Sequence, residues 1–360
     1  MLAYKPNATQ VVSGLRLLYE RKAQDRIFAT MEVPSRALAE FQAEYGEGYC
    51  NYPAPAARVA FWDKLLKERA LLVDDSIPAA YLSELDQGLY GGLLGGEVQF
   101  MAHPDTGWIS SMVAPLLKDW TEFDGLRLDP GHPWFGRYID QTKAFVQAAA
   151  GKFGVSHFIL IDSLNLIFEL IGATQTYLSL DEHPEMVRRA IELAYDLNVC
   201  VQEKFFEIVP LLDGGTCSNM VQWIPGRIVS ESVDPFHMTS VDYFERWGRE
   251  PIERILAHFD GGVVHIHGNG RHLLDAVPTI RGLRAMFLLD DVGFPLAFDV
   301  LSQLQARTGS MPLVVQAEFG AFSEGLQRHE LCGGVLYQVQ NVPGVEAANR
   351  CMEEVRVYRV

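Results

Sequence analysis

The chain has 360 residues, 48% of them apolar and 21% charged, so it can bury a large core and has no stretch with the composition of a disordered segment. Its 46 acidic and 30 basic residues give a formal net charge of −16, which repels phosphate backbones and anionic membranes and argues against nucleic-acid binding. The five cysteines include no Cys-x-x-Cys pair, residues 1–10 lack the features of a signal peptide, and no window is apolar enough to span a membrane. We therefore expect a cytoplasmic protein that does not bind membranes.

Residues 1–72 are predicted to form a helical segment that packs on the main domain. Apolar side chains at helical spacing indicate a helix over residues 7–21, and a second helix is expected over residues 57–72. The glycine-rich run 91–96 lacks the Gly-x-Gly-x-x-Gly pattern of a dinucleotide-binding loop. We expect residues 73–360 to form one domain.

From about residue 135, predicted helices alternate with predicted strands. This alternation is typical of βαβ units and a parallel sheet. Six units are visible, and the less regular first third could supply two more, so we predict an α/β fold of the (β/α)₈ TIM-barrel type. The predicted helix–strand pairs are 134–152 with 155–162, 184–208 with 212–217, 240–259 with 262–267, 272–280 with 283–290, 295–307 with 311–318, and a short helix with 334–340.

The predicted strands are apolar along their length and become polar at their C-terminal ends. Barrel enzymes carry their chemistry at that end, although the fold does not determine which reaction they catalyse. Cys217 has no basic neighbour in the sequence that would activate its thiol, so we interpret it as structural. The polar strand-end residues are Asp162, Cys217, His265, His267, Asp290, Asp291, Glu318, Gln338 and Gln340.

The strongest local signal is the pair His265 and His267. Side chains alternate along a strand, so the two imidazoles should point to the same face and could form half of a divalent-metal site. The two histidines could instead act as a catalytic acid/base pair. The structural alternative is one buried, hydrogen-bonded histidine and one at the rim. A third ligand would come from another strand, with Glu318, Gln340 and Asp291 as candidates. Glu318 could instead act as a general base, or pair structurally with an arginine or a backbone amide.

Four further residues are expected to line the pocket: Asp75, Asn165, Trp223 and Asp291. Asp75 belongs to a carboxylate pair on a turn, and Asn165 lies on a helix that begins at a strand end. Trp223 could stack on a ligand, or cover the barrel mouth without touching one. Glu169 shares a helical face with Asn165, and we expect it on the solvated side of that helix.

Taken in chain order, several segments resemble the uroporphyrinogen decarboxylase superfamily over residues 70–355. The superfamily includes the true decarboxylases and the corrinoid-dependent methyltransferases. The resemblance implies a (β/α)₈ barrel and a cytoplasmic enzyme. The matching segments are Asp74-Asp-Ser-Ile-Pro, Asp162-Ser-Leu-Asn-Leu-Ile-Phe-Glu-Leu-Ile-Gly, Leu180-Asp-Glu-His-Pro-Glu, Trp223-Ile-Pro-Gly, Met238-Thr-Ser-Val-Asp-Tyr-Phe and His265-Ile-His-Gly-Asn.

The resemblance also separates the activities of that superfamily. The true decarboxylases open with an arginine-rich stretch that holds the carboxylates of an octa-acid substrate. Here Arg26, Arg36 and Arg58 are scattered among acidic residues, and a net charge of −16 is unsuited to such a polyanion. We therefore do not expect turnover of uroporphyrinogen.

The methyltransferases of the superfamily hold zinc on a His-x-Cys pair and on a cysteine of the last strand. By resemblance, His265 matches the first ligand, His267 replaces the first cysteine, and Gln340 stands where the second would be. We expect a corrinoid-linked methyltransferase-like protein whose altered site binds a divalent metal, zinc being one candidate, and whose partners are a small-molecule substrate and a corrinoid protein. A decarboxylase or other lyase acting on another substrate and a non-catalytic small-molecule binder remain alternatives, and a homodimer is left open.

Overall fold

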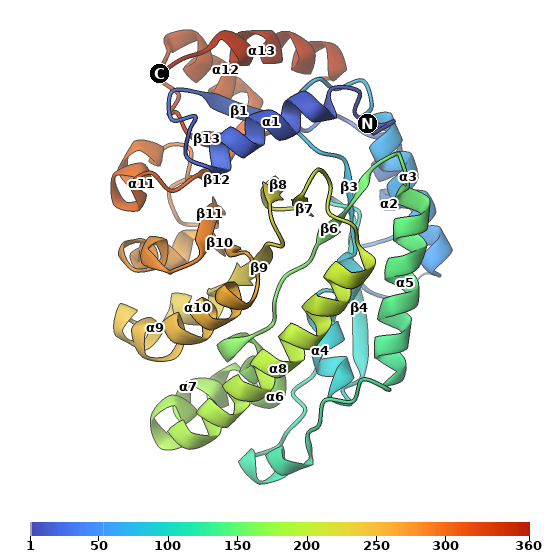
Figure 1. Ribbon diagram of the computed structural model, residues 1–360, viewed down its shortest axis with the longest axis vertical. Helices are drawn as coiled ribbons and strands as arrows, with labels where there is room; N and C mark the ends of the chain where they lie inside the picture. Colours follow the sequence, from blue (N-terminus) through green and yellow to red (C-terminus); the bar gives the residue numbers. More distant parts are fainter. Residues whose placement is uncertain (1, 53) are drawn as a thin grey trace.

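The computed structural model describes residues 2–52 and 54–360, and parallel strands surrounded by helices form its centre. Figure 1 shows α5, α8, α10 and α11 around the outside of these strands. The strands are β1 (Ile27–Met31), β2 (Gly48–Cys50), β3 (Ala79–Tyr81), β4 (Val98–His103), β5 (Trp108–Val113), β6 (Gly154–His157), β7 (Gly215–Ser218), β8 (Gln222–Pro225), β9 (Val229–Ser232), β10 (Gly262–Ile266), β11 (Leu283–Leu288), β12 (Leu313–Glu318) and β13 (Val335–Gln340). The α-helices are α1 (Ala8–Tyr19), α2 (Arg36–Glu44), α3 (Pro55–Glu68), α4 (Gln87–Leu93), α5 (Pro133–Ala149), α6 (Ser163–Ile171), α7 (Ala173–Glu182), α8 (Pro184–Ile208), α9 (Val241–Trp247), α10 (Arg249–His258), α11 (Leu301–Thr308), α12 (Phe319–Arg328) and α13 (Val345–Val357). The 3₁₀ helices are η1 (Ser83–Leu85), η2 (Trp120–Gly125), η3 (Asp234–Met238), η4 (Gly268–Asp275) and η5 (Val277–Thr279).

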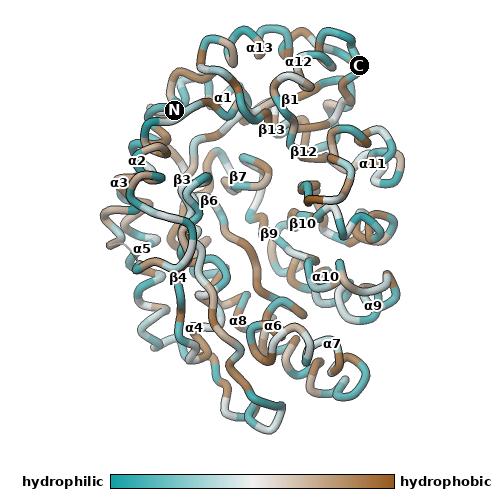
Figure 2. The backbone as a smooth tube through the Cα atoms, turned by 180° about the vertical axis from the view of Figure 1, so that it is seen from behind, coloured by the Kyte–Doolittle hydropathy of each residue, from teal (hydrophilic) through white to brown (hydrophobic). Residues whose placement is uncertain are grey.

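The main sheet has six parallel strands in the order β1-β13-β12-β11-β10-β9. Its two faces enter different apolar clusters. On β10, Val264 and Ile266 join the larger cluster with the surrounding helices, whereas Val263 faces the opposite side. Because side chains alternate along a strand, His265 shares the inner face with Val263. Figure 2 shows hydrophobic residues concentrated in the segment that runs on from β6 toward α6.

A second sheet, β3-β6-β7-β8, meets the main sheet at two places. At the first, the backbone N–H of Leu160 donates to Ser230 O at 2.8 Å. At the second, the N–H of Asp75 donates to Ala29 O at 2.9 Å, and the Asp75 carboxylate accepts from Ala29 N at 3.0 Å. These contacts join the sheets without a continuous strand ladder, so the fold is α/β with a central parallel sheet.

The amino ends of the main strands are closed by α1 and the β7–β8 hairpin. Leu15 and Leu18 of α1 pack in one cluster with Trp223 and Ile224 of β8. Cys217 is buried there, and burial raises the pKa of its thiol to about 12, which agrees with a structural interpretation. Polar side chains can therefore gather only toward the carboxyl ends of the strands.

Several elements differ from the sequence-based predictions. Residues 1–72 include the helices α1, α2 and α3, but they also supply β1, which pairs with β13 in the main sheet. Residues 240–259 form two helices because Gly248 interrupts them; a Cβ at Gly248 would lie 2.7 Å from the ring of Phe236. Residues 272–280 form parts of the 3₁₀ helices η4 and η5, which Ala276 separates, instead of one α-helix. Pro278 disfavours an α-helix there, and Gly268 and Gly270 come just before this segment.

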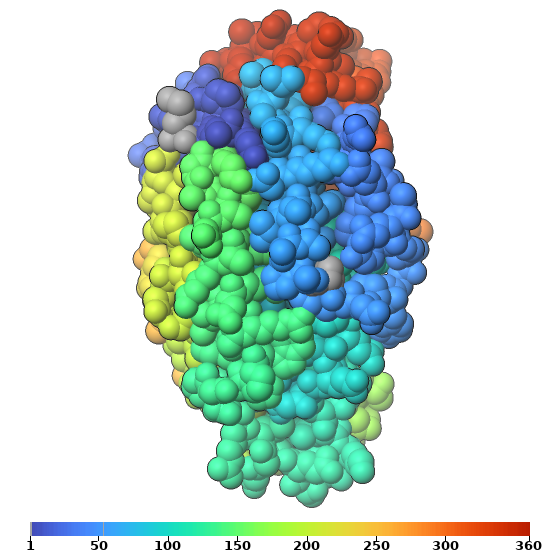
Figure 3. All heavy atoms as spheres, turned by 90° about the vertical axis from the view of Figure 1, so that its right-hand side faces the viewer, coloured from blue at the N-terminus to red at the C-terminus, as the bar shows by residue number. Residues whose placement is uncertain are grey.

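The hairpin β4–β5, which the sequence did not reveal, forms a three-stranded antiparallel sheet with β2. Figure 3 shows the face that lies on the right in Figure 1, where α3 lies beside α5. Among the described residues, no helix combines the length and apolarity that crossing a bilayer requires.

Candidate metal centre

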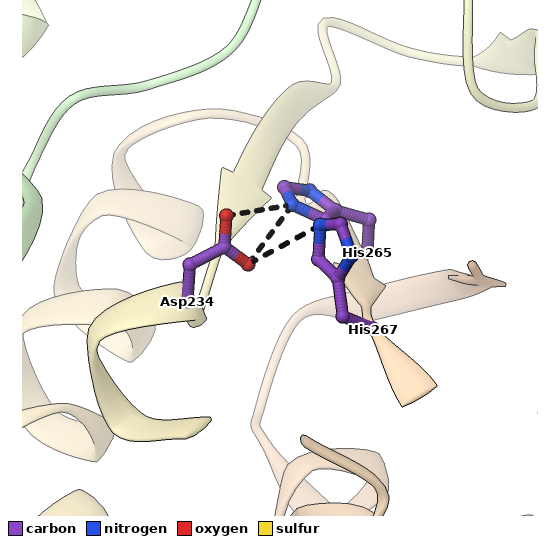
Figure 4. Close-up of side chains that lie close together, drawn as sticks. All are labelled: Asp234, His265 and His267. Carbon is purple, nitrogen blue, oxygen red and sulfur yellow. Dashed lines mark hydrogen bonds and ion pairs between the residues drawn. The ribbon is translucent and has the colours of Figure 1, made fainter. Parts of the chain in front are cut away.

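Three side chains from two neighbouring strand ends converge on one point (Figure 4). His265 lies on β10, His267 follows two residues later, and Asp234 begins η3 directly after β9. The Nε2 atom of His265 lies 3.1 Å from Oδ1 and 3.2 Å from Oδ2 of Asp234, and the Nε2 atom of His267 lies 4.0 Å from Oδ1. The two imidazole centroids are 5.3 Å apart. The histidines therefore point into the same space.

The strand pairing explains why Asp234 reaches this point. Ser232 of β9 is the register partner of His265, so the next turn of chain starts beside the histidine. The Ser232 hydroxyl accepts from the N–H of Asp234 at 3.3 Å, and the Asn165 amide donates to Ser232 O at 3.0 Å. Asn165, which was predicted to line the pocket, therefore supports the loop that carries the Asp234 carboxylate.

The carboxylate of Asp234 is held in its ionised form. Burial alone would raise its pKa, but the hydrogen bond and charge of His265, with the charges of His237 and His267, lower it to about 2. Near neutral pH this site therefore offers one negative oxygen ligand and two imidazole nitrogens.

Behind the metal-facing atoms, Asp291 orients His267. Its Oδ1 atom lies 3.0 Å from Nδ1 of His267, and its Oδ2 atom accepts from the backbone N–H of Asn269 at 3.2 Å. A carboxylate on the far nitrogen of a histidine fixes its tautomer and ring orientation, as is usual for histidine ligands. Asp291, predicted to line the pocket or to bind a metal, therefore holds the imidazole of His267 in place.

The arrangement fits a divalent ion. The ligand atoms of the three residues all lie within 4.8 Å of one another, and theirs is the one such group of three found in the described part of the chain. A tetrahedral ion with bonds of about 2.0–2.2 Å spaces its ligand atoms roughly 3.3 Å apart. Oδ1 of Asp234 is buried and lacks a well-directed hydrogen bond, although it lies close to His265. A cation between these atoms would satisfy it.

A third histidine, His237, packs against the same carboxylate. Its Nδ1 atom lies 3.7 Å from Oδ1 of Asp234, and burial lowers its pKa to about 4, with Asp234 opposing that shift. Gly270 makes room for it, because a Cβ there would lie 2.1 Å from the His237 ring. His237 therefore completes the wall of the site as a neutral imidazole.

The third member of this group, Asp234, was not among the residues predicted to complete the site. Glu318 is exposed, and its Oε2 atom accepts from the amide of Asn341 at 2.9 Å. Gln340 on β13 is its register partner. One strand separates Glu318 from β10, and two strands separate Gln340 from it. The structure does not bring either residue into the group formed by Asp234 and the two histidines, and Glu318 pairs with the side-chain amide of Asn341 rather than with an arginine or a backbone amide.

Two residues expected in the pocket have structural contacts instead. Asp75 is buried, with one oxygen on Ala29 N and the other 2.5 Å from a guanidinium nitrogen of Arg356. Trp223 is fully buried at the amino end of the strands, where its indole N–H donates to Leu212 O at 2.7 Å. Neither side chain is available to a ligand at the carboxyl ends.

Two of the three arginines considered for a polyanion clamp have partners within the chain. Arg58 is buried, with its Nε atom 3.5 Å from Glu84 and a guanidinium nitrogen donating to Gly107 O at 3.0 Å. Arg36 is exposed and pairs with Glu40 at 3.0 Å. Both guanidinium groups are therefore occupied by partners within the chain.

Several buried carboxyl groups lie between the triad and the helices. Burial raises the pKa of Glu169 to about 8, so this residue is not on the solvated helix face as expected. Asp162 and Glu231 interact behind β9, and burial raises both pKa values, that of Asp162 to about 6. Burial also raises the pKa of Asp86 to about 7, against the hydrogen bond from Tyr81. These groups can hold protons near neutral pH.

A cavity of about 410 Å³ lies between the carboxyl halves of the strands, next to the triad. Phe287 of β11 lines it and is the register partner of His265. Tyr81, which hydrogen-bonds to Asp86, lines another part of its wall. The triad itself does not line the cavity, so a ligand in it would lie against the neighbouring strand.

No protein-family model matches the sequence, and no curated protein matches it. Among solved structures, the chain is similar to a methyltransferase from Methanosarcina mazei, with a TM-score of 0.62 over 97% of this chain and 98% of that one. The chain has a methyltransferase-like fold. The two sequences are 12% identical, so the similarity shows the fold alone.

Sequence reasoning missed Asp234 and Asp86. Asp234 follows β9 by two residues, so the rule that polar strand ends carry function could have identified it had β9 been recognised. Asp86 lies beyond a three-residue strand and a 3₁₀ turn, and no periodicity marks it.

Proposed function

We propose that this protein is a methyltransferase-like enzyme whose divalent metal is bound by Asp234, His265 and His267. The observation that carries the proposal is the convergence of one carboxylate and two imidazoles, with Asp291 holding the second imidazole from behind. The fold shared with the Methanosarcina mazei methyltransferase and the sequence resemblance support the reaction class.

A metal held there would act as a Lewis acid that lowers the pKa of a methyl acceptor. Two imidazoles and a carboxylate form a harder and less negative donor set than one imidazole and two thiolates, so an oxygen or nitrogen acceptor suits this centre as well as a thiol. The chain's own part is to hold the ligands. Burial and β9–β10 pairing position Asp234 against His265, and Asp291 orients His267.

A methyl acceptor loses a proton when it takes up the methyl group, and we assign Asp86 as the group that receives it. Its carboxyl group is buried, hydrogen-bonded to Tyr81, and close enough to His265 for the histidine's charge to lower its pKa. With a pKa of about 7, it can exchange a proton near neutral pH.

The methyl donor in this proposal is a corrinoid carried by a partner protein, as the sequence resemblance implies. Support comes from exposed apolar side chains beside the triad. Met238 ends η3, and Val292, Phe294 and Leu296 follow Asp291 in the loop after β11. Apolar side chains exposed around a polar site are typical of surfaces that contact another molecule.

The proposal includes a closed (β/α)₈ barrel as the scaffold of the site. The eight strands would be β1, β3, β6, β9, β10, β11, β12 and β13. The backbone bonds Leu160–Ser230 and Asp75–Ala29 support this closure, because each joins the two sheets where the ladder is interrupted.

Demethylation of methylcobalamin tests the reaction class. The metal-loaded protein is mixed with free methylcobalamin and either 2-mercaptoethanol or imidazole as acceptor, and loss of the methyl–cobalt absorbance is followed. We expect turnover that His265→Ala and Asp234→Ala abolish and that the exposed control His272→Ala retains. Stoichiometric metal binding without demethylation under these conditions would contradict the methyltransferase assignment and favour the binder alternative.

A further inference from the structure

The cavity beside the triad is lined on one wall by a row of uncharged polar side chains. Gln316 of β12, Gln338 of β13 and Thr30 of β1 are register partners across three adjacent strands. All three line the cavity. Paired residues in a parallel sheet point to the same face, so these side chains form one continuous edge.

Directly below this row the same face of the sheet is apolar. Two residues earlier on the same strands are Val314, Leu336 and Phe28, which are also register partners and are buried. Phe287 of β11 pairs in the same layer and reaches the cavity. A ligand would meet amides and a hydroxyl along one edge and hydrocarbon beneath.

The opposite wall is aromatic. Trp62, Trp108 and Tyr81 line it, with Trp108 and Tyr81 packed edge to face at 4.9 Å between ring centroids. Aromatic walls bind planar apolar groups well. The cavity therefore has the shape and surface to take a flat molecule with polar groups on one edge.

The charged side chains at the cavity do not favour an anion. Lys5 is buried, with its Nζ atom 2.5 Å from Asp74, and Arg69 donates to Met31 O at 3.4 Å. Glu32 also lines the cavity and adds negative charge. Arg69 has no carboxylate within ion-pair distance among the described residues, but both Glu32 and Asp105 line the cavity. A carboxylate or phosphate entering the site would therefore lose hydration and meet two like charges for one available cation, in a chain of net charge −16.

We infer that this cavity binds an uncharged molecule with hydrogen-bonding groups along one edge and an aromatic or otherwise flat apolar body. The inference rests on the proposed function, because it assigns this class to the substrate of the neighbouring triad. Amide side chains both donate and accept. Gln338 already donates from Nε2 to Met220 O at 3.1 Å, which leaves its Oε1 atom to accept, and Gln316 can donate or accept. Together they can match a neutral amide, a hydroxyl or a ring nitrogen.

Benzamide and benzoate test the inference because they share one shape and differ in charge. Ligand-observed NMR gives their affinities for the full chain after EDTA treatment, so that benzoate cannot coordinate a metal. The readout needs neither metal nor turnover, so its failure is distinct from a failure of the methyltransferase assignment. We expect benzamide to bind about tenfold more tightly than benzoate.

Variants locate the binding. Gln316→Leu and Gln338→Leu should each weaken benzamide binding about five- to tenfold, whereas Gln303→Leu, on the exposed face of α11, should leave it unchanged. Circular dichroism checks that each variant is folded. If one of the two glutamine variants does not fold, the other still tests the inference. Equal or tighter binding of benzoate, wild-type affinity in both cavity variants, or no benzamide binding up to its solubility limit would each overturn the inference.

Discussion

Nδ1 of His267 lies 3.0 Å from Oδ1 of Asp291, so one nitrogen of this imidazole is held by a carboxylate while the other faces Asp234. This contact distinguishes a prepared ligand from a histidine that only fills space at a strand end. Carboxylates in this position raise the basicity of the imidazole as well as fixing its orientation.

Asp291→Asn should weaken metal binding by about 10- to 100-fold, because the amide oxygen is a weaker acceptor for the histidine N–H. Competition with a chromogenic chelator measures the affinity. Asp299→Asn, on an exposed position of the same loop, is the matched control and should bind metal as the wild type does. Equal affinities in the two variants would show that Asp291 does not support the site.

Glu169→Gln should change how the free energy of unfolding depends on pH. The folded-state pKa of Glu169 is raised to about 8 by burial, so its contribution to stability is fully present below the unfolded value of 4.5 and is lost as pH rises through 8. The slope approaches at most about 1.4 kcal/mol per pH unit. Between pH 5 and pH 8 the free energy of unfolding of the variant should therefore rise relative to that of the wild type. Urea unfolding at a series of pH values measures this difference.

The exposed Glu182→Gln serves as the control for that experiment, since its side chain is solvated in the structure. It should show the same pH dependence as the wild type. Parallel stability curves for Glu169→Gln and Glu182→Gln would mean that Glu169 is ionised in the folded protein at neutral pH.

Asp75→Ala should destabilise the fold without altering the metal centre. The change leaves Ala29 N without its side-chain acceptor and Arg356 without its partner. Because the Arg356 side chain is 33% exposed, the cost is mainly that of the unsatisfied backbone N–H, about 1–3 kcal/mol. Thermal unfolding reports the loss, and metal content of the folded fraction reports the site. If stability were unchanged while metal or substrate binding fell, Asp75 would be a pocket residue after all.

Local periodicity predicted much of the fold. The helix predicted over residues 184–208 has those bounds in the structure, because its apolar positions repeat at helical spacing over its whole length. The sequence also predicted that His265 and His267 point to the same face, because the alternation of side chains along a strand depends only on neighbouring residues.

What the sequence did not reveal depends on contacts between distant segments. Asp234 becomes a neighbour of His265 only through the pairing of β9 with β10, 31 positions apart for these two residues. Trp223 was expected in the pocket because it is aromatic, and Asp75 because it is polar. In the structure the Trp223 indole donates to Leu212 O, and Asp75 pairs with Arg356. Arg356 is remote from Asp75 in the sequence, and Leu212 belongs to no recognisable motif.

The metal content of protein purified without an affinity tag from metal-supplemented cells tests the central claim most directly. Inductively coupled plasma mass spectrometry should find about one divalent ion per chain in the wild type and in His272→Ala, and none in His265→Ala or Asp234→Ala. A wild-type protein without bound metal, or a His265→Ala variant with wild-type content, would contradict the account.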